Sequence, residues 1–236
     1  MTGVTRVRAH AGWELRLLLR NGEQILLMFV IPIALLFALR IMRGGEIGEQ
    51  VPTVLTVSLI ATCFTSLAIG TGFERRAGAL KFLATTPLSR LDLLLGKALA
   101  TGVLAALSVA ALAFVATIMG WRPDIDWFGL GAFGILGGGA FAALAVLLAG
   151  ALRAEAVLAL ANGIFVVLIV FGGVVFAAAD MPPAIGTVVG LLPSAALADG
   201  LNAAITGGTL PAGGLLVLIV WGAAGAVLAR RTFSWD

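Results

Sequence analysis

The sequence predicts an all-α protein, a polytopic bundle of membrane-spanning helices, and three observations carry this prediction. Hydrophobic residues make up 61% of the 236 residues and charged residues only 11%, whereas soluble domains carry about 25% charged residues. Apolar stretches of about 20 residues, long enough to cross the hydrocarbon core as a helix, recur along the chain. The alternating pattern of a membrane β-barrel is not visible in the sequence, and helices satisfy their own backbone groups in lipid.

Six apolar stretches define the expected spans, and the whole chain, residues 1–236, is treated as one transmembrane domain. The spans are placed at 23–42, 51–72, 93–119, 128–150, 156–178 and 211–229. The first is expected to remain in the protein rather than to be cleaved as a signal peptide, because no small-residue cleavage pattern follows it.

Residues 1–22 are expected to form a helix lying along the membrane surface. Apolar residues recur there at helical spacing: Val7, Ala11, Leu15 and Leu18. An apolar face with basic residues beside it is typical of an interfacial helix. The alternative is that the basic residues act only as a flank that orients the first span.

The segment 179–210, between spans five and six, is apolar but interrupted. As a single span it would hold Pro193 near its centre and Asp199 and Asn202 within lipid, which is unfavourable for a helix in a membrane. We therefore expect two short re-entrant helices at the outer side.

The distribution of basic residues predicts the orientation, because cytoplasmic loops are enriched in Lys and Arg. With both termini in the cytoplasm, only Arg40, Arg43 and Arg122 of the 15 basic residues lie outside. This distribution predicts that both termini are cytoplasmic, and the expected location is the plasma membrane of a bacterial cell. Because the basic residues lie at span ends, lipid headgroups are the expected polyanionic partner and nucleic acid is not.

One cytoplasmic loop carries far more charge than the rest of the chain. The stretch 73–97 holds seven of the 27 charged residues: Glu74, Arg75, Arg76, Lys81, Arg90, Asp92 and Lys97. A helix is expected to begin at Phe73 and to end at Pro87, since proline disfavours helical geometry in the residue before it. Ser89 and Asp92 then have the spacing of a capping box that starts the third span. The simpler alternative is a solvent-exposed loop whose charges only fix the membrane topology. This alternative does not explain the proline that ends the first helix or the capping box that starts the next one.

This loop resembles that of ABC-2 type exporter permeases, the membrane subunits that include daunorubicin-resistance-like proteins. The shared pattern is an acidic–basic pair, a glycine, spaced leucines, a Pro-Leu-Ser-Arg run and a Gly-Lys pair: Glu74, Arg75, Gly78, Leu80, Leu83, residues 87–90, Gly96 and Lys97. The segments 14–36 and 191–201 are similar to the interfacial helix and the outer re-entrant helices of that family. The family usually has a second acidic residue where this chain has Arg76.

The resemblance implies a permease half that transports an amphiphilic, lipid-like or drug-like substrate outward. The loop 73–92 would couple it to a separate cytoplasmic ABC ATPase, which would bind ATP and Mg²⁺. The implied coupling residues are Glu74, Arg75, Gly78, Leu80, Lys81, Leu83 and Pro87. A second permease half, identical or homologous, would complete the transporter as a dimer.

The sequence lacks the motifs of an enzyme. It has no phosphate-binding P-loop, and its single histidine, His10, and single cysteine, Cys63, predict neither a catalytic set nor a metal site. No cofactor is therefore expected in this chain. Acidic residues near mid-membrane, which ion-coupled carriers use, are missing too, so the energy is expected to come from outside. Two alternatives remain: a non-transporting membrane scaffold or assembly factor, and a haem permease of cytochrome c maturation.

Mild polar residues within the spans are candidates for a substrate path: Ser58, Thr62, Thr65, Ser66 and Asn162. The simpler interpretation is that each bonds its own or a neighbouring helix, which stabilises packing by about 0.6–2 kcal/mol. Gly134 and Gly138 form a small-residue notch in span four, which suits either packing within the chain or dimerisation.

Overall fold

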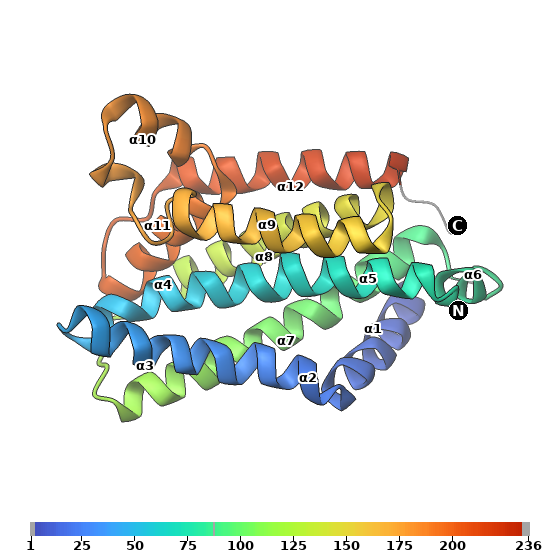
Figure 1. Ribbon diagram of the computed structural model, residues 1–236, viewed down its shortest axis with the longest axis horizontal. Helices are drawn as coiled ribbons and strands as arrows, with labels where there is room; N and C mark the ends of the chain where they lie inside the picture. Colours follow the sequence, from blue (N-terminus) through green and yellow to red (C-terminus); the bar gives the residue numbers. More distant parts are fainter. Residues whose placement is uncertain (1–2, 87, 233–236) are drawn as a thin grey trace.

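The computed structural model describes residues 3–86 and 88–232, and over these residues the chain folds into a helical bundle. Most of the long helices run along one axis (Figure 1). Among the described residues, β-type pairing is limited to one isolated bridge between Asp124 and Thr206. The all-α prediction is confirmed for this part of the chain.

The helices follow one another with short connections. They are α1 (Gly3–Arg20), α2 (Gly22–Ile25), the π-helix η1 (Leu26–Val30), α3 (Ile31–Arg43), α4 (Ile47–Ile60), the π-helix η2 (Ala61–Ser66), α5 (Leu67–Arg76), α6 (Ala79–Ala84), α7 (Arg90–Ile118), α8 (Trp127–Ala151), α9 (Ala154–Phe171), the 3-10 helix η3 (Ala178–Asp180), α10 (Pro183–Gly190), α11 (Pro193–Thr206) and α12 (Ala212–Thr232).

Five helical stretches among the described residues are long and apolar enough to cross a membrane. They are Ile47–Arg76, which joins α4, η2 and α5, together with α7, α8, α9 and α12. These five coincide with the expected spans two to six. The number becomes six if the bent pair α10 and α11 is counted as one span. The expected first span, 23–42, is not among them; there the chain forms α2, η1 and α3 in direct succession, and α3 packs beside α4 and α7.

Span five is shorter than expected. Helix α9 ends at Phe171 instead of continuing to residue 178. Gly172 is the C-cap, and Gly173 has a φ of 83°, a conformation that a residue with a side chain adopts only at a cost. The pair of glycines therefore ends the helix although the apolar pattern continues past it.

The region before the last helix contains two short helices, as predicted. Helices α10 and α11 meet at an angle of 88°, and Pro193 begins α11. One face of α11 is buried against α4, α8 and α12, while Asp199 and Asn202 lie on its exposed face. The chain thus keeps the two polar side chains out of the packed core.

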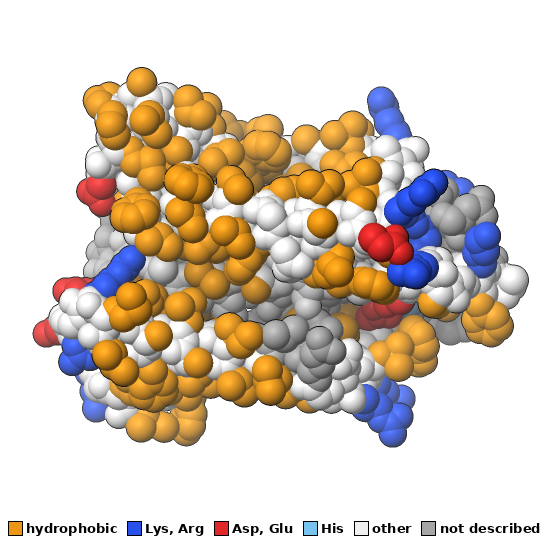
Figure 2. All heavy atoms as spheres, viewed as in Figure 1, with side chains coloured by type: hydrophobic (Ala, Val, Ile, Leu, Met, Phe, Trp, Pro, Cys, Tyr) orange, Lys and Arg blue, Asp and Glu red, His pale blue; other side chains and the backbone are white. Residues whose placement is uncertain are grey.

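The bundle has two charged ends and an apolar middle (Figure 2). Both chain ends and α6 lie at one end of the long axis, and α10 and the α3–α4 connection lie at the other (Figure 1). On the face shown in Figure 2, charged side chains gather at the two ends and hydrophobic side chains cover the region between them. This arrangement is typical of a protein embedded in a bilayer.

Candidate functional site

The end of the bundle that carries the termini also brings together α1, α5, α6, the start of α7 and the α8–α9 connection. We call this region the coupling end. It contains the charged loop singled out from the sequence, and it holds buried ion pairs that link segments far apart in the chain.

Lys97 of α7 is the centre of the coupling end. Its side chain is 1% exposed, and its ammonium group donates to a carboxylate oxygen of Glu14 and, at 2.6 Å, to Oε2 of Glu74. Glu14 comes from α1 and Glu74 from α5. One buried cation therefore joins three helices, an arrangement that is favourable only while its partners remain in place.

The close contact between α1 and α7 depends on Gly96, whose missing side chain leaves room for His10. His10 and Glu14, one helical turn apart, lie on the buried face of α1. A Cβ atom at Gly96 would collide with the imidazole ring of His10. Gly96 thus allows α1 to approach α7 closely enough for Glu14 to reach Lys97.

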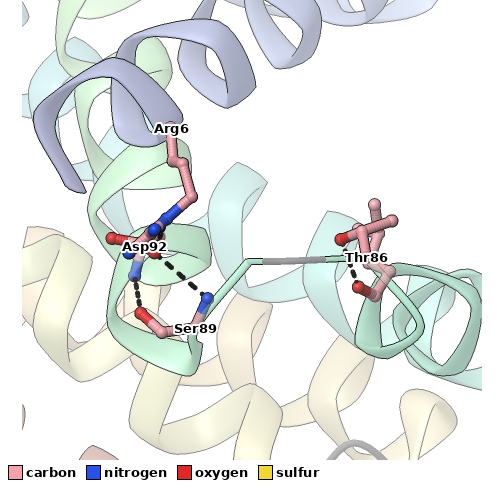
Figure 3. A network of polar contacts seen from close by, with 5 residues as sticks. Arg6, Thr86, Ser89 and Asp92 are labelled. Carbon is pink, nitrogen blue, oxygen red and sulfur yellow. Dashed lines mark hydrogen bonds and ion pairs between the residues drawn. The ribbon is translucent and has the colours of Figure 1, made fainter. Parts of the chain in front are cut away.

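A second ion pair fixes α1 near its start. Arg6 Nε donates to Asp92 Oδ2 at 2.8 Å, and Asp92 also completes the predicted capping box with Ser89, as Figure 3 shows. Ser89 Oγ accepts from the backbone N–H of Asp92 at 3.1 Å, and Asp92 accepts from the backbone N–H of Ser89 at 3.1 Å. The predicted capping box at the start of the third span is therefore confirmed, and the helix begins at Arg90.

The end of α5 is tied to the α8–α9 connection. Arg75 donates to the backbone carbonyl of Gly150 at 2.9 Å and to that of Leu152. The neighbouring Arg76 pairs with Glu155 at 2.5 Å, but both side chains are more than 60% exposed, so this pair contributes little to stability. Of the predicted coupling residues, Glu74 and Arg75 thus face the bundle.

The expected continuous helix from residue 73 to 87 is wrong both at its start, because Phe73 lies within α5, and in its middle. Helix α5 ends at Arg76, Gly78 adopts a left-handed conformation with φ 77° and ψ 3°, and a separate helix α6 begins at Ala79. Glycine adopts this conformation without steric cost. The loop is therefore a helix, a sharp glycine turn and a short second helix.

Helix α6 has an inner and an outer side. Leu80 is fully buried and Leu83 is partly buried against the core. Lys81 is exposed, and the ring of Phe82 is 73% exposed. Pro87 lies outside the described residues. The outward side of α6 therefore carries an aromatic and a basic side chain, and Phe82 was not recognised from the sequence because the apolar pattern alone does not show which side faces out.

Replacing Gly78 by alanine should destabilise the protein by about 1–2 kcal/mol. No atom lies within 4 Å of the added Cβ, so the cost is that of the backbone conformation alone. The matched control is Gly70→Ala in α5, where the helix has ordinary geometry and the added Cβ also meets nothing within 4 Å; it should be neutral or stabilising. Thermal unfolding in detergent would compare the two, and equal effects would contradict a strained turn at Gly78.

A large apolar cavity lies between α7 and α8, away from the coupling end and toward the opposite end of the bundle. Its volume is about 790 Å³, and its lining includes Leu99 and Gly102 of α7 and Gly134 and Gly138 of α8. Trp121 and Trp127 line it as well. Its lining residues are glycines and apolar residues, so it suits a hydrocarbon group rather than a polar or ionic one.

The candidate polar path does not coincide with this cavity. Ser58 lies within 3.0 Å of the hydroxyl of Ser108, which donates to the carbonyl of Met28, and exposed Asn162 donates to a carbonyl of its own helix. Thr62 and Ser66 line a much smaller polar pocket next to Lys97, and the hydroxyl of Thr65 is buried without a partner among the described residues. Their assignment to a substrate path stays a prediction.

Two buried residues of the coupling end, Glu14 and Lys97, were not recognised as a pair from the sequence. The signal for Glu14 was its position between Ala11 and Leu18 on the apolar side of α1, where a charge requires a partner. For metals, no group of three or more His, Cys, Asp or Glu side chains comes together in the described ranges.

The fold and the coupling end define a polytopic membrane protein with one structured charged loop at the end that carries its termini. Comparison with protein families identifies the class of membrane protein. The pattern of the family described as "ABC-2 family transporter protein" matches residues 44–231, which is 188 of the 236 residues. The chain belongs to this family and is the membrane permease part of an ABC transporter. No curated protein matches the chain at a significant level.

Proposed function

We propose that this chain is one membrane half of an ATP-driven exporter, which moves an amphiphilic or lipid-like molecule out of the cytoplasm. A separate ABC ATPase would supply the energy, and a second permease half, identical or homologous, would complete the transporter. The daunorubicin-resistance-like subtype belongs to this proposal as well. The observation that carries it is the coupling end, where the short helix α6 packs on α5, and α5 is tied to α7 through Glu74 and Lys97 and to the α8–α9 connection through Arg75.

The short helix α6 is the proposed contact with the ATPase. Its inner residue Leu80 is packed into the core, and Arg75 just before it is hydrogen-bonded to the α8–α9 connection. A force applied to the exposed side, at Lys81 and Phe82, would therefore reach α5, α8 and α9 with little slack.

The cavity between α7 and α8 supports the proposed substrate class. Its apolar lining would hold an alkyl or ring system, and the polar part of the molecule would remain outside it. The exposed side chains next to the cavity are apolar too, for example Val103 and Ile135. An amphiphile already dissolved in the bilayer could therefore enter from the side.

The proposed orientation places the coupling end in the cytoplasm of a bacterial cell, at its plasma membrane. In Figure 1 both chain ends and α6 lie at the same end, which requires an even number of crossings. Six crossings result if the α2–η1–α3 segment spans the bilayer and the α10–α11 pair returns to its own side. The excess of arginine and lysine at that end supports this orientation.

Co-reconstitution tests the proposal. The permease is purified with a candidate partner ABC ATPase, and ATP-dependent movement of a fluorescent lipid analogue across the vesicle membrane is measured. We expect transport with ATP and none with the permease alone. In the variant Gly134→Leu, whose added side chain enters the apolar cavity, transport should fall several-fold while ATPase binding is unchanged.

A second test is Gly139→Leu, which also begins with nothing within 4 Å of its Cβ and lines the same cavity, so it should lower transport as well. If both variants lower transport, the cavity is on the path. If ATP hydrolysis and transport are absent although the ATPase binds, the chain acts as a membrane scaffold and the proposal is wrong.

A further inference from the structure

Acidic groups outnumber basic groups in the cluster around Lys97. Two carboxylates, Glu14 and Glu74, face a single ammonium group. The side chains of Lys97 and Glu14 are 1% and 6% exposed, and that of Glu74 is 33% exposed. With all three groups ionised, the site would hold one surplus negative charge largely out of water, which is strongly unfavourable.

Neighbouring cations are engaged elsewhere. Arg6 binds Asp92, Arg75 binds the carbonyls of Gly150 and Leu152, and Arg76 binds Glu155. None of these arginines lines the small polar pocket beside Lys97. The surplus charge therefore has no compensating arginine among the described residues of the pocket.

His10 does not supply the missing positive charge. It lies one turn before Glu14 on α1, and burial lowers the pKa of its imidazole, an effect that Lys97 reinforces and Glu14 opposes. Its Nε2 atom is buried and has no hydrogen-bond partner in the described part of the chain. The ring is therefore neutral near pH 7.

The small polar pocket provides the place for a ligand. Its volume is about 30 Å³, and Glu14, Thr71, Glu74 and Lys97 line it together with Thr62, Ser66 and Thr101. Glu14 Oε2 and Thr71 Oγ1 are buried and have no partner within the described ranges. Such a volume admits one or two water molecules between polar groups.

We propose that Glu14 and Glu74 share one bound proton, held next to Lys97 together with an ordered water in this pocket. The proton converts one carboxylate into a hydroxyl donor and makes the cluster neutral. The water accepts from that hydroxyl and donates to an unpartnered oxygen of the pocket, which satisfies the buried groups. Because Glu74 is the partly exposed member, it is the point of proton exchange with solution.

A monovalent metal ion is the competing ligand of the same charge. The ammonium group of Lys97 already contacts both carboxylates and would repel a second cation at the same place. The proton adds no such repulsion, because it neutralises a carboxylate directly. This inference does not depend on the proposed transport function.

Proton linkage of the unfolding equilibrium tests the site on the full-length chain in detergent. The folded protein holds a proton that the carboxyl group of the unfolded chain has already released at neutral pH, so this stability is fully present at low pH and is lost as the pH rises. The unfolding constant of the wild type should increase up to tenfold per pH unit over part of the range from about pH 5 to pH 9.

The variants separate the proton from other titrating groups. Glu14→Gln or Glu74→Gln leaves one carboxylate with Lys97, so neither variant needs the proton and both should lose this pH dependence. Glu155→Gln, at an exposed pair, should keep it. An unchanged pH dependence in both glutamine variants would overturn the proposal, and so would a dependence on sodium concentration at fixed pH.

Infrared spectroscopy gives a second readout, whose first measurement is made on the wild type. The wild type near pH 7 should show the carbonyl band of a buried protonated carboxyl group, and this band should disappear in whichever glutamine variant folds. The absence of that band from the wild type would also overturn the proposal.

Discussion

Replacing Lys97 by methionine should destabilise the protein by about 3–5 kcal/mol, the usual cost of removing one partner from a buried ion pair. Methionine keeps the length and most of the volume of the side chain, so the packing of α7 changes little. What is lost is the donor to Glu14, a residue that is only 4% exposed. Chemical unfolding in mixed micelles would measure the change in the free energy of unfolding.

The control for this prediction is Arg76→Met. Arg76, at the end of α5, forms an ion pair with Glu155 of α9, but the side chain of Arg76 is 61% exposed. Replacing it should therefore cost less than about 1 kcal/mol. Similar losses in both variants would mean that Lys97 is not buried among its partners. Adding Glu14→Gln to Lys97→Met should restore part of the stability, because it removes the stranded carboxylate.

The start of α7 is an example of what the sequence predicts well. Ser89 and Asp92 interact within four residues of each other, so their capping box depends on local geometry alone, and the structure has it. The five long apolar helices were predicted for a similar reason, since the length of an apolar run is a property of one segment. The bend between α10 and α11 follows from Pro193 and is also local.

The features that sequence reasoning missed depend on contacts between distant segments or on single backbone angles. Glu14 and Lys97 are 83 residues apart, and nothing near either residue specifies the other. The break at Gly78 was missed because an isolated glycine is tolerated inside a helix and does not by itself specify a turn. The early end of α9 at Phe171 was missed because the hydropathy of the chain does not change there.

The second large effect is expected at Phe82. Replacing it by alanine should weaken binding of the partner ATPase about 30-fold, which corresponds to the roughly 2 kcal/mol typical of an aromatic residue at the centre of an interface. The ring is 73% exposed at the coupling end and packs little against its own chain. Affinity would be measured by titrating the purified ATPase against the permease in nanodiscs, and the unfolding temperature of the permease should not change.

Phe128 is the matched control, because it is exposed to a similar extent, 76%, and lies in the first turn of α8, at the opposite end of the bundle. Phe128→Ala should leave ATPase binding unchanged, and equal binding by both variants would show that α6 is not the contact. Leu80 would be a poorer test, because it is fully buried and its replacement by alanine would lower stability by about 2–5 kcal/mol as well. A residue that transmits force must be packed on one side and accessible on the other, and α6 meets this condition through Leu80 on its inner side and Phe82 on its outer side.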